Sequence, residues 1–158
     1  MRIEKLGEQR FSIFVNSAYL SNVNPDRDKI IELVKSLLVR LRYRLLLHGF
    51  YKVKVYFHSR VGIFLELIQL ESSDYHSTLD FRTLVYLDEK IYFRTRDYFL
   101  LPDADIYYAN EYYYCNVDDI SNIENIIEFG DFIYGKDLYT IMSVSYTHLR
   151  AHETELHL

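Results

Sequence analysis

The chain has 158 residues, of which 49% are hydrophobic and 26% charged, with one cysteine and a formal net charge of −5. This composition supports one domain or two small ones with a packed core, and it excludes a disordered chain and an internal disulfide framework. No run of about 20 uncharged apolar residues is present, and the N-terminus lacks a signal-peptide pattern, so we expect a cytoplasmic protein that does not cross a membrane.

The charges are distributed unevenly along the chain. Residues 1–60 carry 12 Lys and Arg against 5 Asp and Glu, whereas residues 61–142 carry 5 against 16. The two halves of such a chain either associate with each other or offer opposite charges to different partners.

Residues 1–71 form a predicted β-α-β-β subdomain. In the segment IEKLGEQRFSIFVN, the alternation of apolar and polar residues places Phe11, Ile13 and Val15 on one face of a strand, and Gly7 provides a turn. Residues 51–57 alternate in the same way, HSRVG provides a turn, and the apolar run IFLELIQL at 63–70 returns, which predicts a β-hairpin.

A long helix is predicted between these strands, from Pro25 to about Leu47. Asn24 is the expected N-cap, and Pro25 suits the first helical position because that position needs no N–H donor. One helix face is apolar and is expected to pack on a sheet: Ile30, Val34, Leu37, Leu38, Leu41 and Leu45. Val39, Leu46 and Leu47 lie on the other side, where they would meet a partner protein, the second half of the chain, or a second copy in a homodimer.

Residues 78–142 are predicted to form a β-rich subdomain, joined to the first by the polar segment 71–77. Strands are expected at TLDFRTLVYL and IYFRTRDYFLL with a turn at DEK between them, and IYYANEYYYC predicts a tight hairpin that turns at Asn110 and Glu111. A helix follows at about 119–130, with Ser121 and Glu124 as a capping box and Gly130 as the C-cap. The predicted fold class is α+β, with antiparallel sheets and two main helices.

The C-terminal residues contain two histidines, His148 and His152, whose spacing of four would place both on one helix face, as in many zinc sites. The zinc-protease motif also requires Glu at position 149, which is Leu here. The run VSYTHLRAHET resembles a tail that recurs on unrelated metagenomic proteins through translation into a sequencing adapter. We therefore expect residues 143–158 to be non-native, and we predict neither a metal site nor a cofactor.

The sequence shows no catalytic constellation, so we predict that the protein is not an enzyme. Three histidines are not paired by spacing with a carboxylate or a nucleophile: His48, His58 and His76. Cys115 lies among tyrosines and aspartates in the sequence instead of the cationic groups that would activate a thiolate. Three helical arginines do not form one stripe, which argues against nucleic-acid binding: Arg40, Arg42 and Arg44.

Two groups of residues in the second half are typical of a protein-binding surface. The first consists of hairpin tyrosines, which would also suit an edge that accepts an extended peptide: Tyr107, Tyr108, Tyr112 and Tyr113. The second is acidic and would dock on a basic groove of another protein: Asp118, Asp119, Glu124 and Glu128.

These motifs also resemble a known family. The segments MRIEKLGEQRFSIFVNSAYLSNVN and FYKVKVYFHSRVGIFLELIQL are similar to the N-terminal domain of MecA-type adaptor proteins, and DIYYANEYYYCNVDD is similar to the family's C-terminal hairpin. Abundant Tyr, Ile and Asn fit the AT-rich genes of low-GC Gram-positive bacteria, in which that family occurs. The chain departs from the family in having only ESSDYHS where the family has a long acidic linker.

The resemblance implies a non-enzymatic adaptor, whose first half recognises a substrate protein and whose second half docks on a ClpC-type AAA+ unfoldase. We therefore expect protein partners, with no nucleic acid and no membrane. The alternatives are a self-associating domain that uses Val39, Leu46 and Leu47 at a dimer interface, and an enzyme of unrecognised type.

Overall fold

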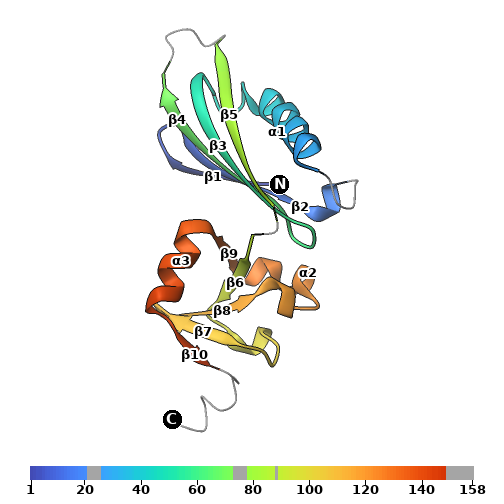
Figure 1. The fold of residues 1–158 in the computed structure, drawn as a ribbon, viewed down its shortest axis with the longest axis vertical. Helices are drawn as coiled ribbons and strands as arrows, with labels where there is room; N and C mark the ends of the chain where they lie inside the picture. Colours follow the sequence, from blue (N-terminus) through green and yellow to red (C-terminus); the bar gives the residue numbers. More distant parts are fainter. Residues whose placement is uncertain (21–25, 73–77, 88, 149–158) are drawn as a thin grey trace. The chain divides into compact units, whose positions relative to one another are not determined.

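The computed structural model describes residues 1–20, 26–72, 78–87 and 89–148, with residues 146–148 described by their backbone alone. The chain divides into two units, Met1–Asp88 and Glu89–Leu158. Each unit contains a five-stranded sheet and helices (Figure 1). The strand pairs are antiparallel with one exception, so the predicted α+β class is confirmed. None of the helices in the described ranges is long and apolar enough to cross a membrane.

The first unit is built on a sheet with the strand order β1-β2-β4-β3-β5. The hairpin of β1 (Arg2–Gly7) and β2 (Arg10–Asn16) lies at one edge, and the predicted hairpin of β3 (Gly49–His58) and β4 (Gly62–Glu71) is confirmed. Phe11, Ile13 and Val15 are buried on one face of β2, as their alternation predicts.

Helix α1 (Arg27–Leu41) covers this face of the sheet (Figure 1). Five residues of the predicted apolar stripe are buried in the core, and Leu45 packs against it: Ile30, Val34, Leu37, Leu38 and Leu41. The predicted start is wrong, because Asp26 is the N-cap and its side chain accepts the N–H of Lys29 at 2.9 Å. The proposed cap Asn24 and Pro25 lie outside the described residues.

The predicted end of this helix at Leu47 is also wrong. The last residues form a separate turn, in which Leu46 has a φ of 54° and the N–H of Leu47 donates to the carbonyl of Arg42 at 2.9 Å. A left-handed residue followed by such a bond ends a helix and reverses the chain. This turn directs Leu47 into the core, where it is 2% exposed.

Strand β5 (Leu79–Leu87) joins the first unit, although the sequence assigned its residues to the second. It pairs parallel with β3, over Gly49↔Leu79 to Phe57↔Leu87, instead of forming a hairpin with the strand that follows DEK. The division between the units therefore lies at Asp88–Glu89, later than the joint expected at 71–77. Most of that joint falls outside the described residues.

Gly49 allows the chain to return alongside β3. It has a φ of +86°, its N–H donates to the Thr78 carbonyl at 2.7 Å, and a Cβ at this position would collide with the carbonyl oxygen of Glu71. Only glycine combines this backbone conformation with so close an approach. The start of β3 is thus fixed against the end of β4 and the segment that leads into β5.

The second unit has the strand order β10-β7-β8-β6-β9, with antiparallel pairing throughout. Its described strands are β6 (Ile91–Thr95), β7 (Ile106–Ala109), β8 (Tyr112–Asn116), β9 (Asp131–Tyr134) and β10 (Tyr146–His148). The two-residue turn is confirmed, with positive φ values of 51° at Asn110 and 70° at Glu111. The backbone of β10 pairs with β7, although its residues belong to the tail that we expected to be non-native.

The single helix predicted at about 119–130 is wrong. The segment consists of short turns instead: η3 (Val117–Asp119), α2 (Ile123–Ile126) and η4 (Ile127–Phe129). The Asn116 side chain accepts the N–H of Asp118 at 2.9 Å, and this local bond competes with a continuous helix. Asn122 precedes α2 without a side-chain cap, so the predicted Ser121 capping box does not form.

A helix that the sequence did not predict, α3 (Gly135–Val144), covers one face of the second sheet, while α2 lies on the other side (Figure 1). Its Leu138 packs with four buried residues of the sheet: Tyr92, Ala109, Tyr114 and Ile133. Only its last two residues, Ser143 and Val144, belong to the tail expected to be non-native.

We expect Gly49→Ala to lower the free energy of unfolding by about 2–4 kcal/mol, because the added methyl meets backbone atoms and the left-handed conformation disfavours alanine. Gly7→Ala is the matched control, since the nearest neighbour of its Cβ is 3.6 Å away, and it should change stability by less than about 0.5 kcal/mol. Urea unfolding followed by circular dichroism measures both variants. Equal stabilities would contradict the role given to Gly49.

Candidate functional site

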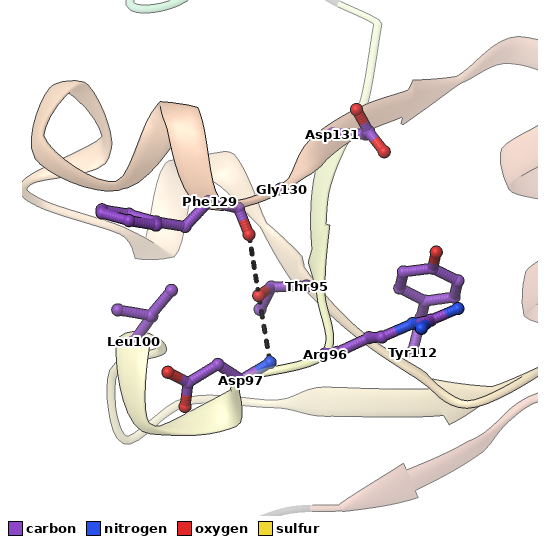
Figure 2. Close-up of a pocket in the computed structure, with 8 residues that line it drawn as sticks. All are labelled: Thr95, Arg96, Asp97, Leu100, Tyr112, Phe129, Gly130 and Asp131. Carbon is purple, nitrogen blue, oxygen red and sulfur yellow. Dashed lines mark hydrogen bonds between the residues drawn. The ribbon is translucent and has the colours of Figure 1, made fainter.

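A cavity of about 540 Å³ lies at the end of β6 in the second unit (Figure 2). Its size suits one or two amino-acid residues of a ligand. The lining residues come from the end of β6 and the two residues after it, from η2 (Tyr98–Leu100), from β8, and from the start of β9 and the two residues before it: Thr95, Arg96, Asp97, Leu100, Tyr112, Phe129, Gly130 and Asp131.

The hydroxyl of Thr95 holds the walls of this cavity together. It donates to the carbonyl oxygen of Phe129 at 3.1 Å and accepts the N–H of Asp97 at 3.1 Å, as the dashed lines in Figure 2 show. Thr95 is only 2% exposed, so water does not replace these bonds. The Asp97 side chain in turn accepts the N–H of Phe99 at 3.1 Å and starts η2.

Gly130 brings the chain close over β6. A Cβ at this position would collide with the carbonyl oxygen of Arg94 and with the Phe93 ring. The backbone of Gly130 is extended, with a φ of −170°, so glycine is needed here for space. This contact sets the positions of Phe129 on one side of the cavity and Asp131 on the other (Figure 2).

Two arginines stack on one tyrosine at the polar side of the site. The guanidinium carbons of Arg94 and Arg96 each lie 4.8 Å from the ring centroid of Tyr112. Arg94 also lies 3.7 Å from the Asp131 carboxylate, and its Nε is buried without a hydrogen-bond partner among the described residues. Such cation–π contacts fix the plane of each guanidinium and leave its edge available.

The other side of the cavity is apolar and open to solvent. The Phe129 side chain is 57% exposed and that of Phe99, in the turn that carries Leu100, is 77% exposed. The Phe99 ring stacks on Tyr98 at 4.6 Å, and the contacts continue to Tyr113 at 5.1 Å and then to Tyr108 at 4.9 Å. We call this group, Tyr108, Tyr113, Tyr98 and Phe99, the aromatic strip.

The structure distributes the predicted hairpin tyrosines over two faces of the second sheet. Tyr107 and Tyr112 lie on the face covered by α3, and Tyr112 lines the cavity. Tyr108 and Tyr113 oppose each other on the other face, within the aromatic strip. The four predicted acidic residues are all exposed in the segment between β8 and β9: Asp118, Asp119, Glu124 and Glu128.

The predicted surface on the long helix is only partly present. Val39 is 61% exposed and Leu46 is 66% exposed, so both are accessible in the first unit. Leu47 is buried and cannot contact a partner, because the turn after α1 directs it into the core. The proposed dimer interface therefore loses one of its three residues.

Two residues that the sequence analysis considered for catalysis, His58 and Cys115, are buried in the structure. The His58 ring accepts the N–H of Arg60 at Nδ1, at 3.2 Å, and the side chain is 9% exposed. Burial, with smaller contributions from Asp119 and Asp105, raises the pKa of the Cys115 thiol to about 12. Within the described ranges, no group of three or more His, Cys, Asp or Glu could hold a metal ion. His76 and His152 lie outside the described residues.

Sequence reasoning found Tyr112 but missed the cavity around it. The motif RTRD contains a signal, because two arginines with a spacing of two share one face of a strand. Their contact with Tyr112 depends on the pairing of β6 with β8, which joins Arg94 to Tyr114 and is not visible in the local sequence.

Comparisons with known proteins do not assign this chain to a family. No protein-family model matches it, and no curated protein and no solved structure is significantly similar to it. The function is therefore inferred from the geometry of the site and from the resemblance of the sequence motifs.

We expect Cys115 to react with iodoacetamide at about pH 8 at least about a hundredfold more slowly in the folded chain than in urea, because only the thiolate reacts. The raised pKa means that the native thiol binds its proton more tightly than the unfolded one. Its contribution to stability is complete below about pH 9 and is lost as the pH rises towards about 12.

Urea titrations at about pH 8 and about pH 10.5 measure this loss. Between these two pH values, the free energy of unfolding should decrease less in Cys115→Ala than in the parent chain. The decrease that remains in the variant is due to Tyr51 and Tyr92, whose pKa values burial also raises. Rapid labelling of the folded chain at about pH 8, or an identical decrease in the variant, would contradict this account.

Proposed function

We propose that the chain is a non-enzymatic protein-binding adaptor, similar to the MecA-type proteins that deliver substrates to a ClpC-type AAA+ unfoldase. The observation that carries this proposal is the pair of exposed phenylalanines, Phe99 and Phe129, beside a cavity with a stacked Arg96–Tyr112 wall. Aromatic residues and arginine provide most of the binding energy in protein interfaces, particularly beside preformed pockets.

The polar groups of the cavity favour binding over catalysis. Thr95 would have to break its bond to the Phe129 carbonyl to act as a nucleophile, and Asp97 would have to release the Phe99 N–H to act as a base. Each change would loosen the wall that the group supports. These side chains therefore maintain the shape of the site.

The charge around the site favours a basic partner. Residues 89–145 carry 11 Asp and Glu against 4 Lys and Arg, and the predicted acidic residues are exposed between β8 and β9. Complementary charge accelerates association and orients the partner more than it strengthens the final complex. The apolar contacts at Phe99 and Phe129 would supply the affinity.

The resemblance divides the roles between the two units. In the adaptor reading, the first unit recognises a substrate protein and the second docks on the unfoldase. The accessible side chains Val39 and Leu46 belong to the first unit, and the cavity and the aromatic strip belong to the second.

We expect the immobilised full-length chain to retain a purified ClpC-type unfoldase and to stimulate its ATPase activity. The double variant Phe99→Ser/Phe129→Ser should weaken retention by more than about tenfold, because it removes two aromatic contacts. Tyr139→Ser is the matched control, since Tyr139 is 80% exposed on α3, and it should retain the parent's behaviour.

Circular dichroism should show that all three chains are folded equally well. Failure of the parent to bind or stimulate the unfoldase would contradict the adaptor proposal. Equal binding by the double variant would show that the partner docks elsewhere.

A further inference from the structure

We propose that the cavity recognises a carboxylate joined to an apolar side chain, with the carboxylate on Arg96 and the side chain against Leu100 and Phe129. Such a group occurs at the C-terminal residue of a partner chain whose other residues are basic, as the acidic residues around the site favour. An acidic side chain next to an apolar residue is the second source. The inference rests on the proposed protein-binding function and specifies the chemistry of that site.

Arg96 presents an oriented cation to the cavity. Its guanidinium stacks on Tyr112 and is exposed, and it forms no ion pair or hydrogen bond with the described residues. A guanidinium held in this way offers two parallel N–H groups along one edge, which match the two oxygens of a carboxylate.

The two carboxylates in the lining have other contacts. Asp131 lies 3.7 Å from Arg94, and Asp97 accepts the N–H of Phe99. Figure 2 shows Asp97 and Arg96 extending in opposite directions from the end of β6. Arg96 therefore forms an ion pair with neither of these carboxylates.

The Arg94 guanidinium stacks on the same Tyr112 ring as Arg96 and lies 3.7 Å from the Asp131 carboxylate. Arg94 does not line the cavity and its Nε is buried, so a ligand in the cavity would meet Arg96 and not this group. A bound carboxylate would therefore pair with Arg96 and leave the contact between Arg94 and Asp131 in place.

The apolar side of the cavity selects the rest of the ligand. Leu100 and Phe129 lie across the cavity from Arg96 and Tyr112, with Thr95 between them (Figure 2). The volume of about 540 Å³ accommodates one residue with its carboxylate and leaves room for the adjoining peptide group. A C-terminal leucine carries both groups that the lining would recognise, a carboxylate and an apolar side chain.

The test uses small probes and nuclear magnetic resonance on the full-length ¹⁵N-labelled chain. N-acetyl-leucine should shift the amide signals of Tyr112 and Gly130, and N-acetyl-leucinamide, which lacks the carboxylate, should bind at least about tenfold more weakly. The α-amide of N-acetyl-glutamate should also bind more weakly than N-acetyl-leucine. Equal binding of this third probe would support a carboxylate site that takes an acidic side chain instead of a chain end.

Variants locate the binding group. Arg96→Gln should abolish the difference between the acid and the amide, and Arg96→Lys should weaken acid binding because it loses the planar fork. Arg82→Gln is the matched control, since Arg82 is an exposed arginine in the first unit. It should leave the titration unchanged, and the spectrum of each variant reports that it is folded.

Equal binding of acid and amide to the parent, undiminished acid binding by Arg96→Gln, or no shift at Tyr112 and Gly130 would each overturn this inference. The outcome is separable from that of the adaptor proposal. Retention of the unfoldase without binding of N-acetyl-leucine would refute only the carboxylate site, whereas the reverse result would refute only the adaptor function.

Discussion

The candidate site depends on the two hydrogen bonds that the hydroxyl of Thr95 forms. This hydroxyl is buried at the end of a central strand, where it bonds to the backbone of both segments that form the cavity walls. Without these bonds, the turn that carries Phe99 and Leu100 would lose its fixed distance from Phe129. A buried threonine with both bonds satisfied therefore converts the end of a strand into a preformed concave surface.

Preformation matters because ordering a surface during binding costs affinity. Gly130 crosses close over β6, and Tyr112 carries two stacked guanidiniums, so the backbone and the charged groups already have defined positions. Phe99 and Phe129 are the exposed apolar side chains here. The site thus combines a preformed polar floor with exposed aromatic side chains, and aromatic residues together with arginine are the residue types most often found at binding hot spots.

Local patterns predicted much of the fold, and non-local contacts explain the rest. Local patterns located β2 and the β3–β4 hairpin of the first unit, and Asn110 with Glu111 located the turn of the second. The parallel partner of β5 was missed because it depends on the close approach at Gly49, which a local pattern does not show. In the site, Tyr112 was predicted from its sequence, whereas its arginine neighbours required the register between β6 and β8.

The most direct test of the adaptor account is hydrogen–deuterium exchange of the full-length chain, measured alone and with a purified ClpC-type unfoldase. The account predicts slower exchange in the complex at residues 96–101 and 128–131, which form the cavity walls. Residues 135–144 in α3 should be unchanged and serve as an internal reference. No protection at the cavity walls, or protection confined to the first unit, would contradict docking through this site.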